Sequence, residues 1–142
     1  MKTLTLITFM CFFSFLSFSK DNELKDSTRI GTQRVSLNGD YWRIAIDSGN
    51  VGIKNAWFKI PPVSASKQTK VPWVIQDIFH DYHGVAWYWR EFDTPEMPDK
   101  GWEYLLKFHA VDYLAGVWIN GNWIGGHEGN EFTFDLNITI VY

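Results

Sequence analysis

One stretch of the chain, residues 110–129, constrains the fold more than any other. Two apolar arms, Val117-Trp118-Ile119 and Trp123-Ile124, flank the dipeptide Asn120-Gly121. A type I′ turn needs positive φ at both central positions, and Asn and Gly tolerate positive φ better than other residues. The pattern therefore predicts a two-residue β-hairpin whose arms pair antiparallel.

Alternation of side-chain character with a period of two continues elsewhere in the chain. Strand-like runs of this kind cover residues 41–46, 85–92, 104–110 and 131–136. Breaks are expected at residues 47–50, 61–70 and 95–101, where turn residues or polar residues gather. Aromatic and β-branched residues in short runs between turns are typical of an antiparallel β-sandwich. We therefore expect an all-β domain of about seven or eight strands.

The N-terminus has the composition of a secretion signal. Met1-Lys2 supplies positive charge, residues 4–18 are almost uninterrupted apolar residues and Ser, and Ser17-Phe18-Ser19 is a small-x-small cleavage pattern. The apolar run has about 15 residues and a membrane span needs about 20, so the pattern predicts a cleaved signal peptide. The predicted organisation is a signal peptide at 1–19, a polar segment at 20–34 and a sandwich domain at 35–142. The mature chain should be secreted or periplasmic, with no membrane span.

Cysteine content and charge exclude several kinds of site and partner. The single cysteine, Cys11, lies inside the predicted signal, so the mature fold should have no disulfide and no thiolate metal site. The residues before Cys11 do not fit a lipoprotein cleavage box, so we expect no lipid anchor. A formal net charge of −3 without a cluster of Lys and Arg argues against nucleic acid as a partner.

The chain is rich in tryptophan, with 8 such residues. Aromatic rings stack on the C–H faces of sugars, so a Trp-rich secreted chain suggests carbohydrate binding. The alternative is that the rings fill the core of a sandwich. Because most of these residues fall in strand-like runs, we expect most of them to be core residues.

Five segments together resemble a known family. They are Ser36-Leu37-Asn38-Gly39 with Trp42 and Asp47, Val71-Pro72-Trp73 with Gln76-Asp77, the G-x-x-W-Y-x-R-x-F pattern of residues 84–92, the A-V-D-Y-x-A-x-V-W-x-N-G-x-x-x-G-x-H-E-G pattern of residues 110–129, and Phe132-Thr133-Phe134-Asp135-Leu136. In this order they are similar to the N-terminal sugar-binding domain of family 2 glycoside hydrolases, the β-galactosidase and β-glucuronidase group. The resemblance implies a jelly-roll, galactose-binding-domain-like sandwich, within an enzyme of carbohydrate metabolism that hydrolyses O-glycosyl bonds.

The chain departs from the family's pattern near its end. After the F-x-F-D segment the family has a loop and a further core strand, whereas here Leu136 leads directly into residues 137–142. Either the loop is deleted and Ile138, Ile140 and Tyr142 lie on that strand, or the chain is truncated within the domain. The family places its two catalytic glutamates on a barrel further along the chain, and no matching motif is present. We therefore assign no catalytic residue and expect this chain to be inactive alone.

Two charged residues within the predicted strands are assigned structural roles. Arg90 lies among aromatic residues, so its guanidinium should stack on Trp or Tyr and pair with Asp112 or Asp135. Glu128 follows His127 beside a glycine turn and is interpreted as a rim residue rather than a catalytic acid.

One segment carries the candidate ligand contacts. His80 and His83, with Asp81 between them, could form part of a metal site, but a surface loop is the preferred interpretation. We therefore predict no metal and no cofactor. In the large β-galactosidases the loop before the glycine that matches Gly84 reaches towards the sugar pocket. The resemblance thus implies Asp81, Tyr82 and His83 as substrate-binding residues, and Trp73 is added as an aromatic ring able to stack on a sugar.

Three functional hypotheses remain open at this point. The first is the sugar-binding domain of a secreted glycoside hydrolase, whose partners would be a β-linked glycoside and the catalytic barrel domain. The second is a free-standing carbohydrate-binding module. The third is a structural or adhesive β-sandwich. Exposed aromatic rings would favour a binding domain, whereas complete burial of the rings would favour the structural domain.

Overall fold

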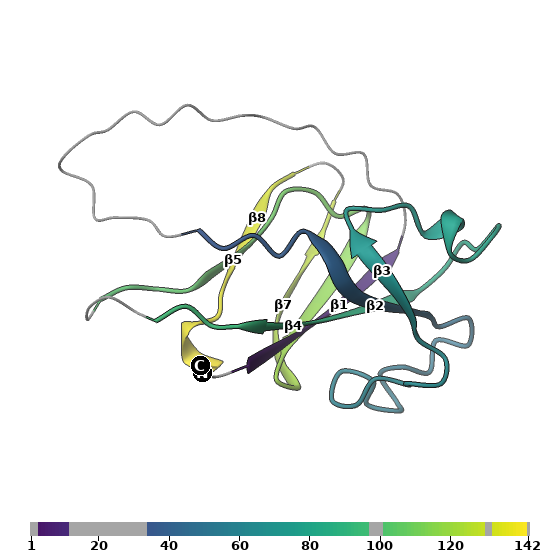
Figure 1. Ribbon diagram of the computed structural model, residues 1–142, viewed down its shortest axis with the longest axis horizontal. Coiled ribbons are helices and arrows are strands. Elements are labelled where there is room, and N and C mark those ends of the chain that lie inside the picture. Colours follow the sequence, from purple (N-terminus) through teal and green to yellow (C-terminus); the bar gives the residue numbers. More distant parts are fainter. Residues whose placement is uncertain (1–2, 12–33, 97–100, 130–131, 142) are drawn as a thin grey trace.

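The computed structural model describes the backbone of residues 3–11 and the full residues 34–96, 101–129 and 132–141. These residues form β-strands and two short 3-10 turns, as Figure 1 shows. The elements are β1 (Thr3–Cys11), β2 (Gly39–Ile46), β3 (Lys67–Val71), η1 (Ile75–Asp77), β4 (Ala86–Asp93), β5 (Leu105–Phe108), β6 (Leu114–Ile119), β7 (Asn122–Glu128), β8 (Phe134–Asn137) and η2 (Thr139–Val141). No helix among them is long and apolar enough to cross a membrane.

The strands form two antiparallel sheets. The larger has the order β3-β2-β4-β1-β6-β7, and the smaller pairs β5 with β8 (Figure 1). The main core draws on both sheets, and its buried members are Trp42, Ile44, Ala86, Tyr88, Leu106, Val117, Ile119 and Ile138. This arrangement confirms the predicted all-β antiparallel sandwich.

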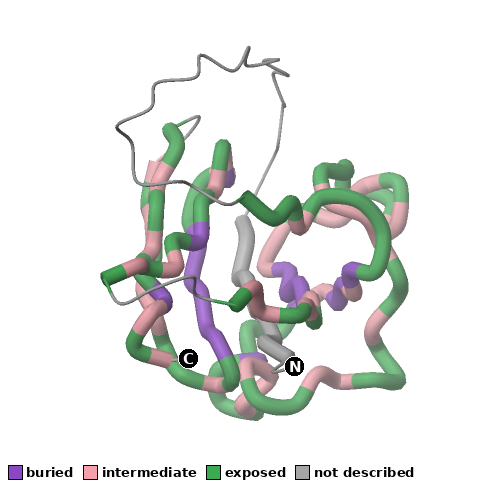
Figure 2. The backbone as a smooth tube through the Cα atoms, turned by 60° about the vertical axis from the view of Figure 1, so that its left-hand side comes forward, coloured by how far each residue is buried: buried purple, intermediate pink, exposed green. Residues whose placement is uncertain are grey.

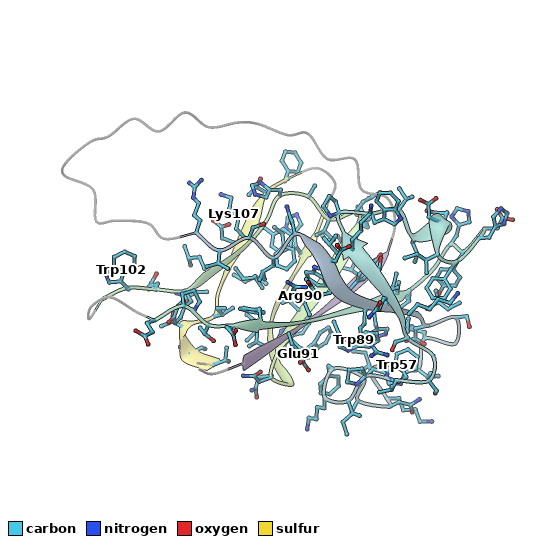
Figure 3. All side chains as sticks on the ribbon, viewed as in Figure 1. Trp57, Trp89, Arg90, Glu91, Trp102 and Lys107 are labelled. Carbon is cyan, nitrogen blue, oxygen red and sulfur yellow. The ribbon has the colours of Figure 1, made fainter. Side chains whose placement is uncertain are left out.

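The opposite face of the large sheet carries a second core. Ala45, Trp87, Trp89 and Trp118 are buried there against Trp57 and Phe58, which come from the connection between β2 and β3. The Trp89 indole donates a hydrogen bond to the Trp57 carbonyl at 3.0 Å (Figure 3). Alternate residues of β4 therefore enter opposite cores, and residues 86–89 are all buried. Figure 2 shows that the buried backbone lies inside the molecule, with exposed segments around it.

Tryptophan is divided between the core and the surface. Trp42, Trp87, Trp89 and Trp118 are buried, Trp57 and Trp102 are half-buried, and Trp73 and Trp123 are 44% and 58% exposed. Four of the 8 tryptophans are therefore core residues, two more are half-buried and two are exposed. The Trp123 ring packs edge-on against Trp118, with ring centroids 4.7 Å apart, and the Trp73 ring contacts the Lys70 ammonium.

A buried carboxylate joins the β2 end to β4. Asp47 is 3% exposed. Its carboxylate accepts hydrogen bonds from the Val51 and Gly52 backbone N–H groups at 2.8 and 2.7 Å, and from the Trp87 indole at 3.0 Å. A Cβ atom at Gly52 would lie 2.3 Å from the indole nitrogen, so only glycine lets this turn approach the ring.

The β6–β7 hairpin has the predicted turn. Asn120 and Gly121 have φ of 51° and 78°, and Ile119 pairs with Asn122 across them. The prediction of positive φ at both positions is confirmed.

Replacing Gly121 by valine should lower the free energy of unfolding by more than about 1 kcal/mol, because a β-branched residue is strained at positive φ. The new Cβ would also lie 3.0 Å from Cγ of Lys59. Urea denaturation measures the change. The control Asn120→Gly, which keeps a residue tolerant of positive φ, should leave the midpoint nearly unchanged. An unaltered midpoint for Gly121→Val would contradict the turn assignment.

The N-terminal segment differs from the sequence expectation. Residues 1–19 were expected to contribute nothing to the fold, whereas Thr3–Cys11 forms β1 between β4 and β6. The cleavage pattern at Ser17–Ser19 and most of the polar segment 20–34 lie outside the described residues. Cleavage of residues 1–19 therefore stays a prediction.

Two sequence predictions are wrong in part: a core strand through Ile138, Ile140 and Tyr142, and a loop over the whole of residues 61–70. Residues 139–141 form η2 rather than a core strand, because the Ile138 N–H donates to the Tyr104 carbonyl and the chain then turns. Ile138 is buried whereas Ile140 is 91% exposed, and Tyr142 lies outside the described residues. The predicted polar loop at 61–70 contains the start of β3, whose polar composition suits an edge strand.

Candidate binding cleft

An open cleft of about 410 Å³ lies at the β2–β3 edge of the large sheet. It is lined by Asp40, Tyr41, Gln68, Thr69, Lys70, Trp73 and Ile78. Apolar rings and hydrogen-bonding groups thus face the same space, which is the usual composition of a small-ligand site.

An irregularity in β2 places one aromatic wall. The register between β2 and β3 shifts between Gly39 and Trp42, and Tyr41 has a φ of 74°. A bulge of this kind re-aims a side chain out of the regular alternation. The Tyr41 ring is consequently 84% exposed at the cleft while the neighbouring Trp42 is buried.

Arg90 supports this wall from β4 (Figure 3). Its guanidinium carbon lies 5.2 Å from the centroid of the Tyr41 ring, and its Nη1 donates to the Asp40 carbonyl. The predicted stacking on an aromatic ring is confirmed. The predicted pairing with Asp112 or Asp135 is wrong for Asp135, which instead pairs with Lys107 at 3.9 Å. The Arg90 Nε atom is buried without a hydrogen-bond partner among the described residues.

Trp73 provides the second aromatic wall. Its ring is 44% exposed, and Nζ of Lys70 lies 3.4 Å from the ring centroid. A cation over the face of an indole holds the ring through its quadrupole, and the partly exposed ring borders the cleft. Lys70 also brings positive charge into the cleft beside the Asp40 carboxylate.

The loop that precedes Gly84 is exposed but does not line this cleft. His80 Nδ1 and an Asp81 carboxylate oxygen are 2.8 Å apart, and both side chains are largely exposed. Tyr82 is half-buried, and its hydroxyl donates to the Val85 carbonyl at 2.7 Å. His83 is exposed.

The predicted site residues are therefore divided. Trp73 lies in the cleft, whereas Asp81, Tyr82 and His83 lie on the nearby loop. Sequence reasoning missed the other residues of the cleft wall, namely Asp40, Tyr41, Gln68, Thr69, Lys70 and Ile78. The family pattern matches the segment around Trp73 and the residues on either side of Asp40 and Tyr41, but it singles out neither of these two residues.

Glu128, the acid beside the glycine turn, is paired with a tyrosine. Glu128 accepts a hydrogen bond from the Tyr113 hydroxyl at 2.8 Å, and this bond together with the carboxylate charge raises the pKa of Tyr113. In the described part of the chain no three His, Cys, Asp or Glu side chains gather as metal ligands would.

Three quarters of the chain aligns with beta-glucuronidases. It is 30% identical to the enzyme of Sus scrofa over 120 residues and 28% identical to that of Felis catus over 119 residues, in each case 75% of this chain and 18% of the enzyme. The beta-galactosidase of Thermoanaerobacter pseudethanolicus is 36% identical over 59 residues, which are 42% of this chain and 8% of that enzyme. No protein-family model matches the chain. The chain thus spans less than a fifth of the length of these relatives, and the matches confirm the resemblance that its five segments indicated.

Proposed function

We propose that this chain, a homologue of family 2 glycoside hydrolases, is the sugar-binding β-sandwich of a secreted glycosidase. The observation that carries the proposal is the cleft at the β2–β3 edge, with the exposed rings of Trp73 and Tyr41 among polar side chains. In this proposal hydrolysis of the O-glycosyl bond uses two carboxylates of a catalytic barrel domain, and the sandwich supplies contacts to a β-linked glycoside.

The chemistry of the cleft suits a sugar. The C–H face of a pyranose can pack on an indole or phenol ring, while its hydroxyls exchange hydrogen bonds with Gln68, Thr69, Lys70 and Asp40. The volume of about 410 Å³ falls within the range usual for small-ligand sites. Asp81, Tyr82 and His83 are proposed as a second set of contacts, on the loop that follows the Trp73 wall and η1.

The N-terminal sequence supports a destination outside the cytoplasm. Met1-Lys2, the apolar run and the small-x-small pattern at Ser17–Ser19 are the features of an export signal. We therefore propose that the protein is secreted or periplasmic. Mass spectrometry of the exported protein should find Lys20 at the N-terminus, and an exported protein that retains residues 1–19 would contradict this.

Replacing Trp73 by alanine should abolish measurable sugar binding. A site held partly by another domain loses contacts and preorganisation when studied alone, so we expect dissociation constants near the millimolar range, about −4 kcal/mol. NMR titration with β-galactosides and β-glucuronides measures this binding. The matched control is Trp123→Ala, which removes an exposed indole outside the cleft. Equal binding by both variants would exclude the cleft, and micromolar binding to the parent chain would favour a free-standing binding module.

The chain alone should not hydrolyse nitrophenyl β-galactosides or β-glucuronides above background. Retaining glycosidases need two carboxylates about 5–5.5 Å apart, and no residue of the chain matches the catalytic motifs of the family. Release of nitrophenol is measured with the purified chain. Turnover that persists through purification and disappears in Glu128→Gln or Asp81→Asn would contradict the proposal that hydrolysis requires a catalytic barrel domain.

A further inference from the structure

Strand β1 holds the large sheet together. It pairs with β4 from Thr3↔Asp93 to Met10↔Ala86, and with β6 from Leu6↔Ile119 to Cys11↔Leu114. In the strand order β4 and β6 are not neighbours, so β3-β2-β4 and β6-β7 are joined through β1. We call the position between β4 and β6 the acceptor slot.

The two strands that border the acceptor slot are buried. Residues 86–89 of β4 and 115–119 of β6 all lie in the interior, on both faces of the sheet. Backbone N–H and C=O groups along their facing edges need hydrogen-bond partners, because a buried polar group without a partner is costly. An empty slot would expose both edges and the two cores beside them, so the fold requires a strand there.

The sequence of the present occupant suits this position. Residues 3–11, T-L-T-L-I-T-F-M-C, carry no charge, no proline and no glycine. Proline or glycine would weaken a strand that is paired along both edges, and Ile, Thr and Phe are among the residues enriched in strands. The same residues belong to the predicted secretion signal. Cleavage after export would therefore remove the strand that completes the sheet.

We propose that the acceptor slot is a strand-binding site whose occupant is Thr3–Cys11, and that removal of residues 1–19 leaves it open to a strand of this sequence supplied in trans. The structural basis is the two-sided pairing of β1, the burial of both neighbouring strands and the composition of residues 3–11. None of the residues that line the cleft belongs to β1, β4 or β6. The readouts below are unfolding, peptide binding and cross-linking, so a failure of this proposal is distinguishable from a failure of sugar binding.

The first experiment compares the full chain with a variant that starts at Lys20. The probe is a synthetic peptide of residues 3–11 carrying terminal lysines for solubility and serine in place of Cys11. We expect the full chain to unfold cooperatively and the shortened chain to lose this transition. Addition of the peptide should restore the transition, with saturable one-to-one binding.

Backbone-methylated peptides provide the matched controls. Methylation of the odd-numbered or of the even-numbered nitrogens removes the donors towards one neighbouring strand and leaves every side chain unchanged. Either peptide should bind at least about tenfold more weakly, because several ladder hydrogen bonds are lost. Equal binding of methylated and unmodified peptides, or a shortened chain as stable as the full chain, would overturn the proposal. Dimerisation of the shortened chain that excess peptide does not reverse would overturn the assigned occupant.

A cross-linking experiment on the full chain tests the register without shortening it. In a Cys11→Ser background, the pair Thr3→Cys and Asp93→Cys lies directly opposite across β1 and β4, where Cβ atoms are about 4.5–5.5 Å apart. The control pair, Thr3→Cys with Phe92→Cys, is shifted by one residue within β4, which directs the side chains to opposite faces. Mass spectrometry should find a disulfide in the first pair and at least about tenfold less in the control. Equal yields, or none in either pair, would contradict the assigned position of β1.

Discussion

Replacing Asp47 by alanine should lower the free energy of unfolding by at least about 3 kcal/mol. The carboxylate accepts three hydrogen bonds, from Val51, Gly52 and Trp87, within a site that is 3% exposed. Removing it leaves these donors without a partner, and each unsatisfied buried donor costs about 1–3 kcal/mol. Alanine also leaves space beneath the Trp87 indole, which is completely buried.

Urea denaturation of the parent chain and three variants tests this expectation. Asp47→Asn keeps one acceptor oxygen but points an NH₂ group at hydrogen-bond donors. It should therefore lower the free energy of unfolding by less than Asp47→Ala does. Asp77→Ala removes an exposed carboxylate from η1 and should change the free energy of unfolding by no more than about 0.5 kcal/mol. A loss below about 1 kcal/mol for Asp47→Ala would show that the turn at 47–52 does not anchor β2 to β4.

The features that sequence predicted best depend on local chemistry. The Asn120-Gly121 turn follows from the φ preference of two residues. The strands β2 and β4 follow from the period-two alternation of side chains within each segment, which can be read without knowing the strands they pair with. Both faces of β4 are buried: Ala86 and Tyr88 lie in the main core, and Trp87 and Trp89 lie in the second core. Its aromatic residues still favour a strand. Such signals are complete within a window of about ten residues.

The features that sequence missed depend on distant partners. Lys67–Val71 reads as a polar loop and becomes a strand only because β2 offers an edge to pair with. Residues 3–11 are apolar enough for both a signal peptide and a buried strand, and periodicity does not separate these two fates. Alternation put Tyr41 on a regular strand face, whereas the register shift beside it turns the ring into the cleft.

The family resemblance overlaps with the candidate cleft at one position only. It pointed to Trp73 and the loop before Gly84, and the cleft does include Trp73. The Tyr82 hydroxyl, however, donates a hydrogen bond to the Val85 carbonyl. Tyr82 also lies against Gly84, where an added Cβ would be 2.7 Å from the hydroxyl oxygen. A residue that matches the family in position thus has a structural role here, in addition to any ligand contact proposed for it.

Alkaline pH should destabilise the chain through Tyr88, and Tyr88→Phe should remove that loss. Burial raises the pKa of Tyr88 from 10.0 to about 12, and the residue is 7% exposed in the main core. Below pH 10 the folded and unfolded states both hold the phenolic proton, so its contribution to stability is complete. Between about pH 10 and 12 the unfolded state releases the proton first, and the free energy of unfolding falls by about 2 kcal/mol.

Urea denaturation at pH 9, 10, 11 and 12 measures this loss as a difference between variants, which cancels the titration of other groups. Relative to its own value at pH 9, the parent chain should lose about 2 kcal/mol more than Tyr88→Phe by pH 12. The control Tyr41→Phe removes a phenol that is 84% exposed and should follow the parent curve. If Tyr88→Phe fell as steeply as the parent, burial of this phenol would not be the source of alkaline instability, and ionisation elsewhere in the core would have to explain it.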